Sequence, residues 1–271
     1  MAAVSIAVLS LKGGTGKTTT VRTLTDVLRR VGLDVLAIDL DPQGNLSDYF
    51  DVPPDATPTV ADVLRGEAKV GDATHDGIVP ASPILAEVER SLSGRMGREL
   101  VLRKALKDAR RQHDVILIDC PPALGLLTIN GLVGADWALI SSEAQYFALQ
   151  GVEGALEVVE QAKEYYNDDL DWLGVVLNIA DMRTRHSQEA FTSLKDHFGD
   201  KVFDTVIRSS IAYAESAEKG RSILDHRPDL GADYLHLTDE VLQRIDLPAP
   251  RRRLKKLLAE LAPPPAERQA S

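Results

Sequence analysis

The sequence predicts an α/β protein with a doubly wound, mostly parallel sheet and helices on both faces of that sheet. Short segments that are apolar throughout alternate along the chain with longer segments of helical periodicity. Strands without a polar face are typical of a parallel sheet that is covered on both sides. A glycine-rich turn between the first apolar segment and the first helical segment is typical of the same class.

The expected elements follow these patterns in chain order. Residues 4–9 form the first apolar run, and the helical pattern after the glycines, with apolar residues three or four apart, ends at Gly32. Further strands are expected at residues 34–39, 114–119, 137–141, 173–178 and 203–207. Helices are expected at residues 60–65, 99–112, 149–166 and 188–198. Right-handed crossovers should connect the parallel strands.

The composition of the 271 residues is that of an ordinary globular protein, with 44% hydrophobic and 27% charged residues. It excludes a disordered chain and a collagen-like chain. Cys120 is the single cysteine, so an intrachain disulfide and any metal site that needs two or more cysteines of one chain are excluded. No apolar run approaches the roughly 18–20 residues of a membrane span, and the apolar start lacks the basic segment of a signal peptide. These features are consistent with a cytoplasmic protein.

The charge is distributed unevenly along the chain. The net charge of −10 argues against a protein that coats nucleic acid with its whole surface. Residues 248–271 carry six Lys or Arg and two Asp or Glu, so an acidic body of net charge −14 ends in a basic segment of +4. We therefore expect one domain over residues 1–247 and a proline-bracketed basic tail over residues 248–271. Within that tail, residues 251–261 have the pattern of a short amphipathic helix.

The strongest functional signal is the glycine-rich loop between the first strand and the first helix. Its glycines allow several backbone N–H groups to turn toward phosphate oxygens, and the following helix adds the positive end of its dipole. Lys17 would place a charge on the β- and γ-phosphates, and the Thr18 hydroxyl would bind Mg²⁺. The expected nucleotide-binding residues of this loop are Gly13, Gly14, Thr15, Gly16, Lys17, Thr18 and Thr19.

One position departs from the usual phosphate-loop pattern, because Leu11 stands where the first glycine of G-x-x-x-x-G-K-[ST] belongs. Lys12, directly before the double glycine, makes the loop resemble the deviant Walker A motif of the ParA/MinD family of dimeric P-loop ATPases. The resemblance implies a P-loop NTPase fold in which two subunits enclose two ATP molecules. It also implies that Lys12 reaches the nucleotide of the partner subunit and belongs to the catalytic set with Lys17.

Three aspartates lie at the carboxyl ends of predicted strands, where ligands bind in doubly wound sheets. Asp119 ends an apolar strand, which is where an acid that holds Mg²⁺ through water belongs. Asp39 ends another strand and is expected to support the metal shell. The segments after these two strands resemble the switch segments of the ParA/MinD family. By that resemblance, Asp41 orients or activates the attacking water.

The resemblance extends over roughly residues 4–245 and is strongest to ParA proteins of the short, Soj-like type. Asp-Pro-Gln-Gly-Asn at residues 41–45 is typical of them, and the segments 129–132, 145–151, 181–188 and 211–220 are similar to theirs. Asn178 stands where the family forms its adenine pocket, so a contact with the base is expected from it, although many relatives have Thr there. Because the loop lies within the first dozen residues, no N-terminal helix-turn-helix and no specific operator binding are expected.

The resemblance also implies partners. ParA proteins bind DNA without sequence preference when ATP is bound, and release it after hydrolysis that a ParB-like protein stimulates. We therefore expect a cytoplasmic, nucleoid-associated ATPase that uses ATP and Mg²⁺ and is a homodimer when ATP-bound. Contacts between basic side chains and phosphates suffice for such DNA binding. The expected contacts are Arg208, Lys219 and Arg221, with Arg183 and Arg185 as alternatives.

Two other functions remain open from the sequence. MinD-like positioning ATPases bind membranes through a C-terminal amphipathic helix, and residues 251–261 have leucines on one face with basic residues beside them. The other readings of that segment are a helix docked on the protein itself and a DNA-contacting arm. A P-loop metabolic ligase shares the fold, but the extra lysine and both switch segments argue against it. An iron–sulfur relative would need more cysteines per chain.

Overall fold

The computed structural model describes residues 3–145 and 147–261. Its centre is a seven-stranded sheet in the order β3-β2-β4-β1-β5-β6-β7, in which every neighbouring pair is parallel. The strands are β1 (Val4–Leu9), β2 (Val35–Asp39), β3 (Ile78–Val79), β4 (Val115–Asp119), β5 (Trp137–Glu143), β6 (Asp171–Ala180) and β7 (Val202–Arg208). Every residue of β2 and β4 is buried, as expected for strands covered on both faces. The predicted fold class is confirmed.

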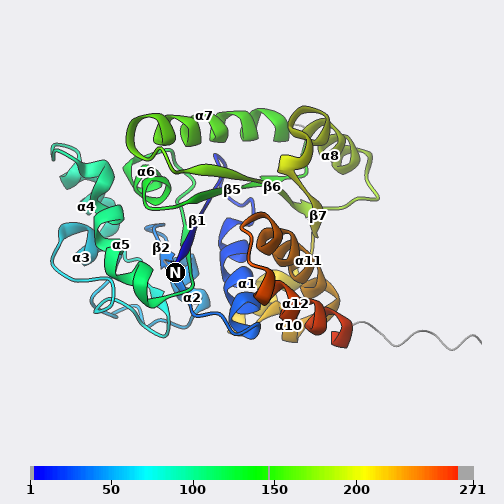
Figure 1. The fold of residues 1–271 in the computed structure, drawn as a ribbon, viewed down its shortest axis with the longest axis horizontal. Helices are drawn as coiled ribbons and strands as arrows, with labels where there is room; N and C mark the ends of the chain where they lie inside the picture. Colours follow the sequence, from blue (N-terminus) through cyan, green and yellow to red (C-terminus); the bar gives the residue numbers. More distant parts are fainter. Residues whose placement is uncertain (1–2, 146, 262–271) are drawn as a thin grey trace, which may run out of the picture.

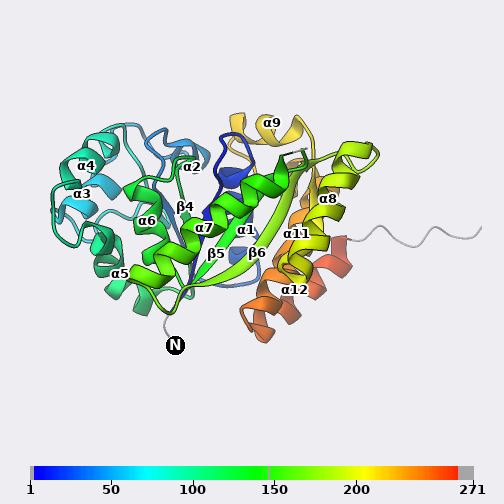
Figure 2. The same cartoon turned by 90° about the horizontal axis from the view of Figure 1, so that it is seen from above.

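Helices cover both faces of this sheet (Figures 1 and 2). One face packs against α1 (Lys17–Arg30), α10 (Ile223–His226), α11 (Pro228–Arg244) and α12 (Pro248–Leu261). The other packs against α5 (Val101–Gln112), α6 (Leu126–Val133), α7 (Ala148–Tyr166) and α8 (Arg185–Phe198). The remaining helices are α2 (Asn45–Tyr49), α3 (Val60–Arg65), α4 (Leu85–Leu92) and α9 (Ala212–Glu218). The two apolar clusters, one on each side of the sheet, hold it in place.

The predicted strands and long helices are present, with differences at their ends. The helix predicted at residues 188–198 begins earlier, at Arg185, because the Thr184 side chain accepts a hydrogen bond from the Ser187 amide and caps it. The long helix α11 was not predicted. Several short elements were not predicted either, namely β3, α2, α4, α6, α9 and α10. Each has eight or fewer residues, which is too few for a periodic pattern to stand out.

The basic segment that follows the main domain forms α12 and packs along α11. Leu254 is fully buried, and Leu257 and Leu258 pack partly buried against the same apolar cluster as α1 and α11. The Arg251 guanidinium donates two hydrogen bonds to the Asp239 carboxylate on α11, at 2.8 and 2.9 Å. None of the described helices is long and apolar enough to cross a membrane. Residues 262–271 of the predicted tail lie outside the described residues.

Candidate nucleotide-binding site

The glycine-rich loop joins the carboxyl end of β1 to the first residue of α1, Lys17. Gly14 and Gly16 have φ angles of 77° and 83°, a region that favours glycine. Gly16 is also constrained by a close approach, because an added Cβ would lie 3.2 Å from Nδ2 of Asn178. At Gly13 and Gly14, by contrast, an added Cβ would meet nothing within 4 Å. The loop is therefore supported beneath Gly16 and open at its first two glycines.

Two buried side chains from neighbouring strands support the loop from below. Ser141 on β5 donates a hydrogen bond from Oγ to the Thr15 carbonyl at 2.7 Å. Asn178 on β6 donates from Nδ2 to Ser141 Oγ at 2.7 Å and to Thr20 Oγ1 at 3.3 Å. The amide nitrogen of Asn178 is thus used to hold the loop, whereas its Oδ1 is buried without a partner. Sequence reasoning missed Ser141, which carries no recognisable pattern of its own.

The first turn of α1 brings a lysine and a hydroxyl to the loop. Lys17 is only 6% exposed and lines the cleft beside the loop. Thr18 donates a hydrogen bond from Oγ1 to Oδ2 of Asp119, the last residue of β4, at 2.7 Å. Oδ1 of Asp119 is buried and has no partner. Burial raises the pKa of Asp119, and the nearby charge of Asp39 raises it further.

This arrangement fits magnesium better than a metal held mainly by protein side chains. The described residues contain no group of three or more His, Cys, Asp or Glu side chains that could hold a metal ion. Mg²⁺ prefers oxygen ligands and takes only one or two from protein, completing its shell with water and substrate phosphates. The Thr18 hydroxyl and the orphaned Oδ1 of Asp119 are oxygen ligands beside the phosphate loop. A cation here would also offset the unfavourable burial of the Asp119 carboxylate.

The other two predicted acids lie on the turn after β2. Asp39 accepts hydrogen bonds on Oδ2 from the amide and hydroxyl of Ser47, at 2.9 and 2.8 Å, and on Oδ1 from the Asp41 amide at 3.0 Å. Both of its oxygens therefore bind the turn and the start of α2. Burial raises the pKa of Asp39 to about 6, although these hydrogen bonds oppose the shift. Asp41 caps the turn through the Gln43 amide at 3.0 Å and lines the cleft.

Lys12 and Lys17 are five residues apart but face different surroundings. Lys17 is buried in the cleft, whereas the Lys12 side chain is 63% exposed and is not among the residues that line it. Its Nζ lies 2.7 Å from Glu143 Oε2 and 2.9 Å from Gln145 Oε1, at the end of β5. Sequence reasoning did not assign Glu143 and Gln145 to this role. Residues 145–151 were recognised in the sequence only as a segment similar to that of the family, without a role for Gln145.

The cleft continues from the loop toward α2, β7 and α9, with a volume of about 780 Å³. Its wall away from the phosphate loop includes the apolar and aromatic side chains Tyr49, Ile179, Ile207 and Tyr213. Flat apolar surfaces of this kind suit a planar base beside a phosphate site. The expected base contact, Asn178, also lines the cleft, but at the loop. Tyr49, Ile179 and Tyr213 were not predicted as contacts with the base, because they come from three separate elements, α2, β6 and α9.

The structure separates the predicted DNA contacts. Arg208 lines the nucleotide cleft, and its Nε donates to Asp233 on α11 at 2.9 Å. It is therefore already paired with an acid. Lys219 and Arg221 are exposed on the turn between α9 and α10, and neither forms a salt bridge with any part of the chain that the structure describes. The alternatives are paired, Arg183 with Asp181 at 2.8 Å and Arg185 with Glu189 at 2.6 Å.

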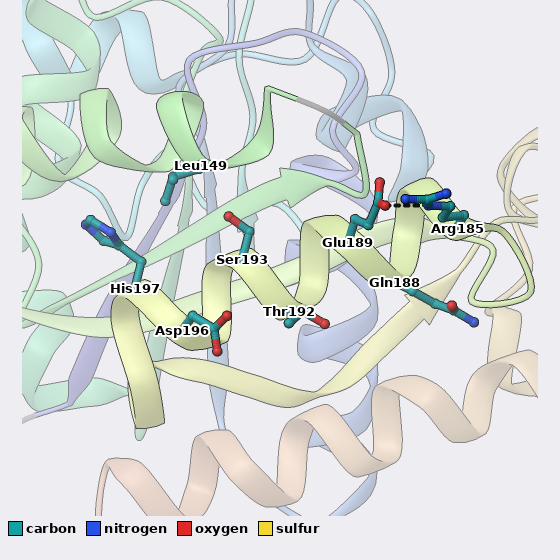
Figure 3. Close-up of a pocket in the computed structure, with 8 residues that line it drawn as sticks. All are labelled: Leu149, Arg185, Gln188, Glu189, Thr192, Ser193, Asp196 and His197. Atoms are coloured by element: carbon teal, nitrogen blue, oxygen red, sulfur yellow. Dashed lines mark hydrogen bonds and ion pairs between the residues drawn. The ribbon is translucent and has the colours of Figure 1, made fainter.

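A separate hollow of about 730 Å³ lies between α7 and α8. Figure 3 shows Leu149 on α7 near a row of polar side chains on α8, with Arg185 bound to Glu189 at one end. The hollow is open and does not include the glycine loop or the three aspartates. The predicted phosphate-loop residues and Asp41 line the other cleft, at the carboxyl ends of the strands.

Comparison with known proteins agrees with this geometry. A family model described as an AAA domain matches residues 3–172. The sporulation initiation inhibitor protein Soj of Bacillus subtilis is 37% identical over 245 residues, which cover 87% of this chain and 97% of that protein. The chromosome-partitioning ATPase Soj of Thermus thermophilus is 38% identical over 247 residues, covering 89% and 96%.

A solved structure with a bound nucleotide is also similar. Cobyrinic acid a,c-diamide synthase from Mycobacterium smegmatis, with an ATP analog and magnesium bound, is 36% identical with a TM-score of 0.72, covering 80% of this chain and 93% of that one. The chain belongs to the Soj/ParA family of chromosome-partitioning ATPases.

Proposed function

We propose that the protein is an ATP-driven dimerising switch that binds DNA without sequence preference and partitions or positions a chromosome, plasmid or other cargo. ATP closes a homodimer, and hydrolysis stimulated by a ParB-like protein opens it again. The switch works in the cytoplasm, on the nucleoid. Membership of the Soj/ParA family supports the ATPase and partition parts of this proposal.

ATP and Mg²⁺ fit the cleft that the loop forms. The loop amides from Gly13 to Thr19 and the N-terminal end of α1 attract the phosphates, and Lys17 adds a charge at the buried end of the cleft. Thr18 and Asp119 hold Mg²⁺, which neutralises charge that develops on the phosphate oxygens. Asp41 orients the attacking water from the cleft wall. Asp39 positions Asp41 through the hydrogen bond to its amide.

The observation that carries the dimer is the position of Lys12. A lysine that served its own nucleotide would line its own cleft, as Lys17 does, but Lys12 points outside it and is mostly exposed. Glu143 and Gln145 hold it there at 2.7 and 2.9 Å. Lys12 is 63% exposed although Glu143 is only 16% exposed, and an ion pair at the surface is worth about 1 kcal/mol or less. Lys12 can therefore exchange these partners for the phosphates of a second subunit at little cost.

Sedimentation of the purified protein in Mg-ATP and in Mg-ADP tests the switch. The Asp41→Ala variant should remain a dimer in Mg-ATP, because it binds the nucleotide but lacks the group that orients water. Its kcat should fall by about 10²–10⁴. The Lys12→Ala variant should bind ATP as a monomer, whereas Lys163→Ala, which removes another half-exposed and ion-paired lysine on α7, should dimerise normally. An Asp41→Ala protein whose dimerisation ignores the nucleotide would refute the switch.

The DNA part of the proposal is tested separately. Binding to random-sequence duplex DNA should occur in Mg-ATP and not in Mg-ADP, because the closed dimer doubles the number of phosphate contacts. The affinity should fall steeply as salt is raised. Lys219 and Arg221 are the exposed cations that we propose for this contact, and Arg208 contributes only if it leaves Asp233. Binding that is equal in both nucleotides contradicts ATP control.

A further inference from the structure

The exposed face of α12 carries three cations that the site does not use. Arg252, Lys255 and Lys256 are all exposed. Their spacing of three and four residues places them on one side of the helix. None of the three forms a salt bridge with the residues that the structure describes. This basic face of α12 (Arg252, Lys255 and Lys256) is a concentrated positive surface in a protein whose net charge is −10.

The opposite face of α12 fixes the helix on the body of the protein. Leu254 is fully buried, and Leu257 and Leu258 pack beside it. Arg251 is bound through two hydrogen bonds to Asp239. Paired hydrogen bonds of this kind set the orientation of a helix as well as its distance. The basic face is therefore presented outward on a docked helix.

The three cations repel one another, and the acid that the structure places near them is Asp239, whose pKa is lowered first by its hydrogen bond to Arg251 and also by the charge of Lys255. Like charges three or four residues apart on a helix repel and destabilise it by a few tenths of a kcal/mol per pair. Acidic residues outnumber basic ones by 41 to 31 in the chain, yet residues 251–261 contain five basic residues and one acid, Glu260. The repulsion would be relieved by an anion that spans several side chains. The phosphates of a nucleic acid backbone are such a polyanion.

We propose that the basic face of α12 is a contact surface for the phosphate backbone of DNA. The proposal rests on the DNA binding proposed above and adds a surface distinct from Lys219 and Arg221. The burial of the leucines favours DNA over a membrane, since an interfacial helix needs a free apolar face to enter the lipid. On α12 that face is packed against the protein as far as Leu258.

The basic face lies at the end of α1 opposite the phosphate loop. The guanidinium of Arg253 lies against Gly32, just after the C-terminal end of α1, where an added Cβ would be 3.3 Å from Nη1. The phosphate loop precedes the N-terminal end of the same 14-residue helix. A helix of that length spans roughly 21 Å. Changes on α12 should therefore leave nucleotide binding intact, so that effects on DNA can be measured separately.

The test replaces the three cations in the full chain, as Arg252→Gln/Lys255→Gln/Lys256→Gln. Glutamine is a good helix former with a long side chain, so α12 should stay folded and docked. Binding to random-sequence duplex DNA is measured in Mg-ATP over a salt titration. Each lost phosphate contact lowers the slope of log K against log salt by about 0.9. The slope should therefore be shallower than that of the wild type by about 2.7 for each subunit whose α12 contacts the DNA, and by about 5.4 for a closed dimer that uses both.

A matched control removes three exposed cations from one side of another helix, as Lys104→Gln/Lys107→Gln/Arg111→Gln on α5. Figures 1 and 2 show α5 at the far end of the molecule from α12. The control has the same net charge as the test variant. If the control keeps the slope of the wild type, the effect belongs to α12. An equal loss in both variants would mean that only the overall charge matters and would overturn the proposal.

The remaining outcomes separate this proposal from the proposed function. A test variant that dimerises with ATP and keeps the wild-type slope overturns the α12 contact and leaves ATP-controlled DNA binding in place. A wild-type protein that dimerises with ATP but binds no DNA overturns both DNA proposals and leaves the dimer switch. Binding of the wild type to phosphatidylglycerol vesicles, lost in the test variant, would assign the basic face to lipid and overturn the proposal.

Discussion

The two ends of α1 are built in opposite ways. At its N-terminal end, the cleft contains buried polar atoms without partners, Oγ1 of Thr15 and Oδ1 of Asp119, and a second buried carboxylate, Asp39, whose pKa is raised to about 6. Beyond its C-terminal end, α12 buries Leu254 completely and pairs Arg251 with Asp239 through two hydrogen bonds. The N-terminal end therefore has buried polar atoms without hydrogen-bond partners, whereas the region beyond the C-terminal end is well packed.

This difference shows where the protein places function and where it places stability. Unpaired buried groups cost free energy in the empty protein, and they remain useful only if a ligand supplies the missing partners. A docked helix adds stability without any ligand. The phosphate end should therefore respond strongly to nucleotide and contribute little to the stability of the fold. The α12 end should show the reverse, and three substitutions test this contrast.

The largest expected effect is on stability, from Leu254→Ala. The side chain is fully buried between α12 and the cluster of α1 and α11, so its truncation leaves a cavity. The free energy of unfolding should fall by about 2–5 kcal/mol, as measured by urea denaturation without nucleotide. The Kd for ATP should stay unchanged at temperatures where the variant is folded. Leu257→Ala, at a partly buried position, should cost less, and an equal cost would contradict the docking described here.

A smaller effect, on binding alone, is expected from Lys17→Ala. A lysine that donates charged hydrogen bonds to phosphates contributes about 1.5–3 kcal/mol, which corresponds to roughly 10- to 150-fold in Kd. Calorimetric titration with ATP and Mg²⁺ should show this loss, and turnover should disappear with it. The unfolding free energy of the nucleotide-free protein should change far less than in Leu254→Ala. A large loss of stability without nucleotide would show that Lys17 is also structural.

The contrast between the two ends is also a contrast in what the sequence can predict. The phosphate loop and the strand ends were predictable because their chemistry depends on local spacing. Glycines and Lys17 follow one strand, and Asp39 and Asp119 end two others. Parallel strands bring their carboxyl ends to one edge, so these residues meet without further information. The structure places Thr18 and Asp119 in contact, as that reasoning requires.

The rest depends on tertiary contacts that one sequence does not encode locally. The periodicity of residues 251–261 fits a lipid surface, a DNA arm or a docked helix, and only the burial of Leu254 selects among these. Arg208 reads as a free cation until Asp233, 25 residues later, is seen beside it. Asn178 was expected at the base, but Ser141 and Thr20 hold its amide nitrogen beneath the loop. Each of these partners lies on a different element.

The smallest expected effect comes from Asp119→Asn, which should raise the stability of the empty protein at the expense of function. Burial raises the pKa of Asp119, and burial raises the pKa of Asp39 to about 6. The folded protein therefore holds these protons at pH values where the unfolded chain has released them. Its unfolding free energy should fall as the pH rises from about 4 through 6 and above. The variant removes one of the two interacting charges and should lose part of that decline.

The gain should be larger at pH 8 than at pH 5, because burial raises the pKa of the wild-type carboxyl and a lower pH favours its neutral form. Urea denaturation with EDTA at the two pH values measures it. Adding Mg-ATP should reverse the order of stability, because the cation favours the ionised carboxylate and the variant offers it only an amide. An equal gain at both pH values would trace the effect to packing. No gain at pH 8 would mean that the buried carboxylates cost the empty protein nothing, and the contrast between the two ends of α1 would fail.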